Sequence, residues 1–172
     1  SKYAGADPGH LARLQAATLL ADDLGDFEAA LKELEAVKGA HEGGAAALAK
    51  RLLEPALSIS SERVFTSAEA PAAALAVRNI ESVRFRLWTL DLRDYFDKKS
   101  STAGLHDLEV SVIAPDQEWE FKVPAYARHR EFKLPVLLPK KDPGAYVILA
   151  SAGALEAKTV VLVSDIALAA RA

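Results

Sequence analysis

The stretch that decides the fold is Val83-Arg84-Phe85-Arg86-Leu87-Trp88, in which apolar and charged side chains alternate along the chain. Residues 118–123 repeat this alternation, with acidic or basic residues between aromatic and aliphatic ones. A period of two residues is typical of an antiparallel strand with one buried and one solvated face. The pattern predicts that Val83, Phe85 and Leu87 point into a core. Arg84, Arg86 and Trp88 then share the outward face.

Other strands are expected on both sides of these two stretches, separated by turn-forming clusters rich in Pro, Gly, Asn and Asp. Their expected positions are residues 63–67, 73–79, 108–114, 130–134, 145–150 and 157–163. The turns fall at residues 79–82, 114–117, 140–144 and 151–154. Seven or eight short strands at this spacing predict an antiparallel β-sandwich over residues 58–164. Residues 91–99 are expected to form a short helical excursion between two of its strands.

The first 57 residues have a different period and predict a helical segment of two or three helices. Asp7 is placed to cap the first helix, with Pro8 at its first position, where a missing N–H has no cost. Gly25 is placed to end that helix in the left-handed conformation. Asp26 can cap the next helix, whose apolar stripe recurs at the helical period: Phe27, Ala30, Leu31, Leu34 and Val37.

A loop is expected from Gly39 to Gly44, followed by a third helix over residues 45–53 with Leu48, Leu52 and Leu53 inward. Pro55 ends this helix, because the residue before a proline is disfavoured in the α region. The chain as a whole is therefore predicted to be α+β with segregated parts. The expected parts are a helical segment at 1–57, the sandwich at 58–164 and a link to a following domain at 165–172.

Composition excludes several classes of function. The chain has 172 residues and a net charge of −3, which gives no electrostatic reason to expect nucleic acid or an anionic membrane as a partner. Cysteine is absent, so disulfides, cysteine nucleophiles and iron–sulfur clusters are excluded for this segment. No apolar run reaches the roughly 20 residues that span a bilayer. Methionine is also absent, even at position 1, which favours a processed product or a piece of a longer protein.

The chemistry-bearing residues form no convincing catalytic or metal-binding pattern. The four histidines are His10, His41, His106 and His129, and none lies within four residues of another. No nucleophile-elbow motif is present to position a serine for a triad. Asp91, Asp94 and Asp97 would share one face of a helix and attract a hard cation. They lack the Gly and bidentate Glu of a dedicated calcium loop, so a solvated face is favoured. No catalytic residue, cofactor or metal is therefore expected.

The best candidate surface is the outward face of residues 84–88. Arg84, Arg86 and Trp88 on one strand could bind an anion or a sugar ring, or could pack against a neighbouring domain. Trp and Arg are favoured anchors at contacts between proteins. Because a helical segment belongs to the same chain, a domain contact is the favoured interpretation.

Two resemblances to known families add to these predictions of fold and function. The segment Gly25-Asp26-Phe27-Glu28-Ala29-Ala30-Leu31 resembles the second helix of a tetratricopeptide repeat, although only one copy is present. Three stretches in order resemble the macroglobulin-type β-sandwich domains of bacterial alpha-macroglobulin family proteins. They are residues 77–96 (VRNIESVRFRLWTLDLRDYF), residues 119–126 (WEFKVPAY), and residues 142–148 (DPGAYVI) followed by the hairpin through Gly153 to residues 161–165.

The second resemblance implies a role in a much longer protein that traps or inhibits proteases. Such a chain would be one non-catalytic structural module, with neighbouring domains as its partners and proteases as partners of the intact protein. The resemblance also implies export to the periplasm or cell surface. The thioester that many members carry needs a cysteine, which this segment lacks. The alternative is a stand-alone binding or adhesion module for a carbohydrate or protein. A hydrolytic enzyme is the third possibility, and no motif supports it.

Overall fold

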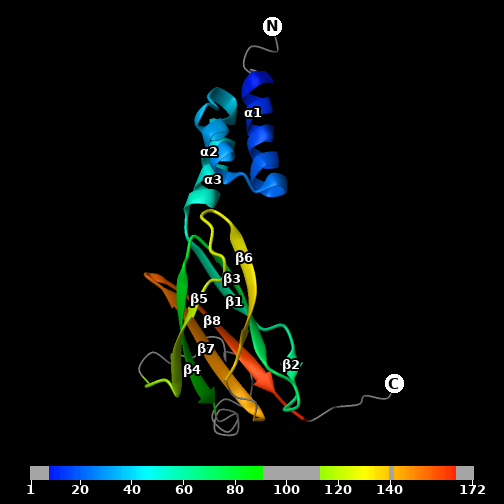
Figure 1. The fold of residues 1–172 in the computed structure, drawn as a ribbon, viewed down its shortest axis with the longest axis vertical. Helices are drawn as coiled ribbons and strands as arrows, with labels where there is room; N and C mark the ends of the chain where they lie inside the picture. The colour runs from blue at the N-terminus through cyan, green and yellow to red at the C-terminus, as the bar shows by residue number, and fades with distance from the viewer. Residues whose placement is uncertain (1–7, 91–112, 140–141, 166–172) are drawn as a thin grey trace, which may run out of the picture. The chain divides into compact units, whose positions relative to one another are not determined.

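The computed structural model describes residues 8–90, 113–139 and 142–165 (Figure 1). The chain divides into two compact units. The first consists of Ser1–Pro55 together with Ala127–Arg130, and the second consists of Ala56–Tyr126 together with Glu131–Ala172. The first unit is helical and the second is a β-sandwich, in agreement with the predicted segregation of helices and strands.

The first helix begins at Pro8, as the sequence predicts, and Asp7, its expected cap, lies outside the described residues. Helix α1 (Pro8–Leu19) runs into a π-helical turn, η1 (Leu20–Leu24), which ends at Gly25 in the left-handed conformation with φ 67°. Helix α2 (Phe27–Glu35) is capped by Asp26, whose Oδ1 accepts a hydrogen bond from the N–H of Ala29 at 3.0 Å. A single 3₁₀ turn, η2 (Gly39–His41), then leads directly into α3 (Glu42–Leu53).

A small apolar core holds these helices together, and it includes the predicted stripe of α2. Its buried members are Ala17, Ala21, Ala30, Leu34, Val37, Ala45 and Leu52. Two expectations about α3 are wrong. The helix begins three residues early and includes Gly43 and Gly44. At Gly44, a Cβ would come 3.3 Å from Leu14 Cδ2, so glycine allows a close approach there. Leu53, expected inward, is 54% exposed and lines a shallow apolar groove between α2 and α3.

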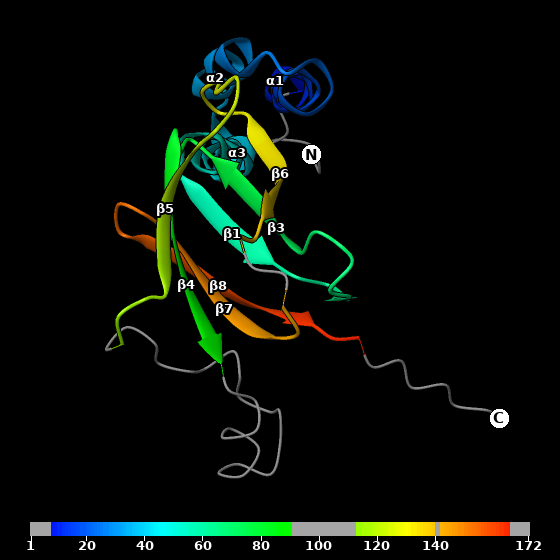
Figure 2. The ribbon, with the colours of Figure 1, turned by 60° about the horizontal axis from the view of Figure 1, so that its bottom comes forward.

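The second unit is a sandwich of two sheets, which appear as separate layers in Figure 2. The three-stranded sheet has the order β1-β3-β6, with β1 Ala56–Ser60, β3 Ala72–Arg78 and β6 Glu131–Leu137. The five-stranded sheet has the order β2-β8-β7-β4-β5. Its strands are β2 Val64–Phe65, β4 Ser82–Leu90, β5 Gln117–Lys122, β7 Gly144–Ala152 and β8 Leu155–Val163. All pairings are antiparallel except the two-residue parallel pairing of β2 with β8.

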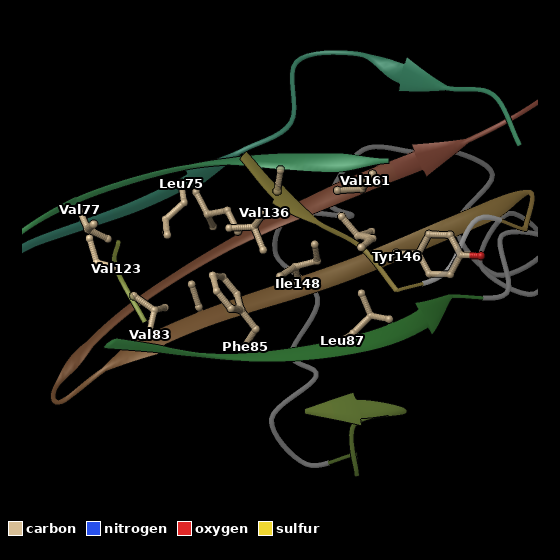
Figure 3. Close-up of a cluster of buried hydrophobic side chains, with 14 of the residues drawn as sticks. Leu75, Val77, Val83, Phe85, Leu87, Val123, Val136, Tyr146, Ile148 and Val161 are labelled. Carbon is tan, nitrogen blue, oxygen red and sulfur yellow. The ribbon is translucent and has the colours of Figure 1, made fainter. Parts of the chain in front are cut away.

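The core lies between the sheets, as Figure 3 shows, and it contains the residues that the alternation selects. Val83, Phe85 and Leu87 of β4 are fully buried. The ring of Phe85 stacks on Trp119 of β5 at a centroid distance of 5.3 Å. Leu75, Val77 and Val136 face them from the other sheet. Burying side chains of this size stabilises the fold by about 1.5–3 kcal/mol each.

Tyr146 links the start of β7 to the turn that precedes this strand. The side chain of Tyr146 is buried, and its hydroxyl donates a hydrogen bond to the carbonyl oxygen of Asp142 at 2.6 Å. A tyrosine near the start of this strand, bonded to backbone a few residues upstream, is the tyrosine corner of immunoglobulin-type sandwiches. The motif Asp142-Pro143-Gly144-Ala145-Tyr146 therefore has a defined structural role.

The strand predictions differ from the structure at β1 and at residues 113–114. Strand β1 occupies residues 56–57, which were expected to be helical, and extends through residues with no predicted strand. The expected strand at 108–114 falls mostly outside the described residues, and Ile113 and Ala114 are not in a strand. The helical excursion at 91–99 and all but the first residue of the expected link at 165–172 also lie outside them. Edge strand β6 contains Pro135, a residue that discourages further strand pairing because it has no N–H to donate.

Candidate functional site

The outer face of the five-stranded sheet is built on β4, where Arg84, Arg86 and Trp88 are spaced two residues apart. The residues between them are buried between the sheets, so these three side chains lie on the opposite face. This face has two halves along the strand. The half near Arg84 and Arg86 is charged, and the half around Trp88 is apolar and buried.

In the charged half, one glutamate contacts both arginines. Glu118 of β5 lies directly opposite Arg86 in the strand register and diagonally opposite Arg84. Its Oε1 is 3.5 Å from Arg84 Nε, and its Oε2 is 3.9 Å from Arg86 Nε. The Arg84 side chain is 63% exposed, so this pair contributes little to stability. The arrangement places one carboxylate within ion-pair distance of two guanidinium groups.

A shallow groove of about 380 Å³ opens beside these arginines. It is lined by Ser82, Arg84, Arg86, Glu120, Ser151, Ala152, Gly153 and Glu156, which come from four adjacent strands and the β7–β8 hairpin. Of these residues, only Arg84 and Arg86 are predicted from the sequence as members of a binding face. Glu120 was visible as an outward residue of residues 118–123, but its position beside Arg84 follows only from the β4–β5 register.

Trp88 lies on the outer face of β4, as the alternation predicts, but its side chain is only 4% exposed. Its Nε1 donates a hydrogen bond to the carbonyl oxygen of Ile113 at 2.9 Å. The ring belongs to an apolar cluster with Ala145, Val147, Leu149 and Val160. This burial corrects the expectation that Trp88 is offered at the surface beside the two arginines. The exposed part of the predicted face consists of Arg84 and Arg86.

Three of the four histidines, His10, His41 and His129, belong to the helical unit. His10 Nδ1 accepts a hydrogen bond from the N–H of Lys38 at 3.3 Å. His129 Nδ1 lies 3.0 Å from the carbonyl oxygen of Leu52 near the C-terminus of α3, and its ring meets Phe27 edge-on at 6.4 Å. His41 Nε2 is buried, with no hydrogen-bond partner recorded among the described residues. His106 lies outside them.

Among the described residues, no group of three or more His, Asp or Glu side chains is placed to hold a metal ion. Asp91, Asp94 and Asp97 lie outside the described part of the chain. None of the helices in that part is long and apolar enough to cross a membrane.

No family model matches the chain, and no curated protein matches its sequence. The structure is similar to two crystal structures of native alpha-2-macroglobulin fragments from Escherichia coli. The fragment spanning domains NIE-MG1 aligns with 70% of this chain and 65% of that chain, at 17% identity and a TM-score of 0.47. The fragment spanning MG0-NIE-MG1 aligns with 69% of this chain and 42% of that chain, at 16% identity and a TM-score of 0.48. The chain thus spans less than two thirds of either fragment.

Proposed function

We propose that this chain is a non-catalytic structural module of a larger alpha-macroglobulin-like protein that traps or inhibits proteases. The support is the sequence resemblance of the three stretches described above. Together they contribute four strands to the five-stranded sheet: β4 from the first, most of β5 from the second, and strands β7 and β8 from the third. The resemblance therefore falls on the segments that build one continuous sheet. Its outer face is, in this proposal, the contact surface for a neighbouring domain.

The structural observation that supports the proposal is the pair of arginines on that face. Glu118 lies within ion-pair distance of both Arg84 and Arg86, and Arg84 is exposed. Arginine is enriched at contacts between proteins. Charges at such contacts contribute more to the choice and orientation of a partner than to affinity.

The alternative is a stand-alone module that binds a carbohydrate or another protein. A sugar ring usually needs an exposed aromatic side chain on which to stack. Trp88 is buried, and no aromatic residue lines the groove beside Arg84. These observations favour a protein surface over a sugar as the occupant of this face.

The first experiment is to measure the mass of the native protein in its source cells by immunoblot with an antibody raised against this chain. A band above roughly 100 kDa is expected for a protein built from many domains of about 100 residues. A band near the 18.4 kDa of this chain would overturn the proposal and favour the stand-alone module. Fractionation of the same cells tests the proposed export, which predicts the band in the periplasmic or surface fraction.

A second experiment tests whether protease trapping requires the full-length protein. The isolated chain is expected neither to inhibit trypsin at equimolar concentration nor to become covalently linked to it, whereas the full-length protein should trap the protease. Stoichiometric inhibition by the isolated chain would contradict a purely structural role.

A further inference from the structure

Four polar side chains lie on one line across the outer face of the five-stranded sheet. In the strand register, Glu120 of β5 is opposite Arg84 of β4, Arg84 is opposite Ser151 of β7, and Ser151 is opposite Glu156 of β8. Neighbouring strands are about 4.8 Å apart, so Glu120 and Glu156 are separated by about 14 Å at the backbone. All four side chains line the groove of about 380 Å³. The line therefore presents negative, positive, hydroxyl and negative groups in that order.

The groups on this line have hydrogen-bonding capacity left over. Among the described residues, neither Glu120 nor Glu156 has a recorded hydrogen bond or ion pair, and both are exposed. Arg84 uses Nε toward Glu118, and a guanidinium has five N–H donors. The hydroxyl of Ser151 donates to the Arg84 carbonyl oxygen at 3.4 Å, a long bond that is easily exchanged.

This pattern of charge excludes the simplest ligands. An isolated anion at Arg84 would be repelled by a glutamate on either side, and an isolated cation at either glutamate would lie near Arg84. A second copy of the chain, docked face to face about a two-fold axis along the strands, would bring Glu120 against Glu156. The fitting ligand carries two positive groups with a negative group between them.

We propose that the groove binds a peptide segment of the form basic-x-acidic-x-basic, supplied by a neighbouring domain. Extended chain advances about 3.4 Å per residue, so positions i and i+4 are about 14 Å apart, matching the span from Glu120 to Glu156. Positions i, i+2 and i+4 point to the same side of an extended chain. The two basic side chains pair with Glu120 and Glu156, and the acidic one pairs with Arg84 and Ser151.

This inference rests on the proposed function, because it names the partner chemistry of the same outer face. The groove is small and solvent-exposed, so charge complementarity supplies orientation and specificity, while the affinity of an isolated peptide stays low. In a long chain, the same contact would be intramolecular and would benefit from a high effective concentration.

The test is an NMR titration of the full ¹⁵N-labelled chain with the capped peptide Lys-Thr-Glu-Thr-Lys. The expected result is a saturable shift of amide signals in β4, β5, β7 and β8 around the groove, with a dissociation constant of the order of 1 mM, about −4 kcal/mol. The scrambled peptide Lys-Lys-Thr-Thr-Glu has the same composition and net charge, and should bind at least tenfold more weakly.

Two double variants locate the binding site. E120Q/E156Q should weaken binding of Lys-Thr-Glu-Thr-Lys at least tenfold. E62Q/E81Q removes the same number of charges from exposed positions outside the groove and should leave binding unchanged. Equal binding of the two peptides, or shifts that persist in E120Q/E156Q, would overturn the inference. If the native protein proves to be large and neither peptide binds, the inference fails while the proposed function stands.

Discussion

The carboxylate of Asp165, just beyond the end of β8, holds Ser67 with both of its oxygens. Oδ1 accepts a hydrogen bond from the Ser67 backbone N–H at 2.7 Å, and Oδ2 accepts one from the Ser67 hydroxyl at 2.7 Å. These two residues are 98 positions apart in the chain. The contact fastens the end of the last strand to the segment that follows β2.

The first prediction concerns this contact. Hydrogen bonds from the backbone N–H and then the hydroxyl of Ser67 lower the pKa of the Asp165 carboxyl below its ordinary value of 3.8. A lowered pKa means that the stabilisation is present above the ordinary pKa and is lost as pH falls below it. D165N should therefore lower the thermal midpoint at pH 7, and the difference from wild type should shrink below pH 4. E62Q is the control, and a constant difference at all pH values would contradict the prediction.

The second prediction concerns Glu69, which accepts hydrogen bonds from the Thr66 backbone N–H at 2.8 Å and from Arg63 Nη1 at 2.7 Å. These contacts, with that from the Thr66 backbone as the largest effect, lower the pKa of Glu69 from 4.5 to about 2. The stabilisation should be complete above about pH 4.5 and should disappear as pH falls toward 2. Acid titration of wild type and E69Q, followed by circular dichroism, checks this. E69Q should lose the part of the acid transition that falls in this window.

The third prediction concerns the Tyr146 hydroxyl. Y146F removes the bond to the Asp142 carbonyl and should lower the free energy of unfolding by about 1–2 kcal/mol in urea denaturation. Y126F is the matched control, because Tyr126 packs against the same core with no recorded hydroxyl bond. Burial, and then the charge of Asp142, raise the pKa of Tyr146 above 10. Wild type should therefore lose stability as pH rises above about 10, and Y146F should lose less.

The fourth prediction separates backbone strain from side-chain contact at His129. This residue has φ 66°, a conformation that costs a residue with a Cβ about 1–2 kcal/mol. H129A should loosen the C-terminal turn of α3, because it removes the contacts with Leu52 and Phe27 and keeps the strain. H129G loses the same contacts and relieves the strain, so it should be the milder variant. Hydrogen exchange of the α3 amides measures both, and H129G at least as damaging as H129A would contradict this account.

The fifth prediction concerns Trp88. Because its ring is buried and Nε1 is bonded to the Ile113 carbonyl, its fluorescence should be resistant to quenching by acrylamide. The other tryptophan, Trp119, is partly buried, so W119F isolates the Trp88 signal. Oligosaccharides should not change that signal. A saturable change on addition of an oligosaccharide would favour the carbohydrate-binding alternative.

Local sequence patterns were sufficient to predict elements that depend on residues close together in the chain. The alternation at residues 83–88 predicted the buried face of β4, and Asp26 and Gly25 marked helix ends correctly. Strand β1 was missed because it is short and Ile59 is its only buried residue, so it shows no alternation of buried and exposed positions. Its position in the sheet depends on pairing with β3, which the local sequence does not indicate. Gly43 and Gly44 were predicted to be loop because glycine is a poor helix former, and the close approach of Gly44 to the distant Leu14 has no local signal.

The candidate site was less predictable, since it depends on which strands are neighbours. Alternation placed Arg84, Arg86 and Trp88 on one face, but the burial of Trp88 involves Ile113, which is 25 residues away. Glu120, Ser151 and Glu156 meet Arg84 only because β5, β4, β7 and β8 are adjacent in that order. Strand order and register are properties of the folded sheet, and no local spacing encodes them.

The contact between His129 and Leu52 has a consequence for the order in which the protein is made. The two residues are 77 positions apart, and residues 127–130 belong to the helical unit although most of the sandwich sequence separates them from it. During synthesis the three helices leave the ribosome long before His129 is added. The end of α3 therefore lacks this partner while β1, β3, β4 and β5 are being translated, and the helical unit is completed only after these strands have been made.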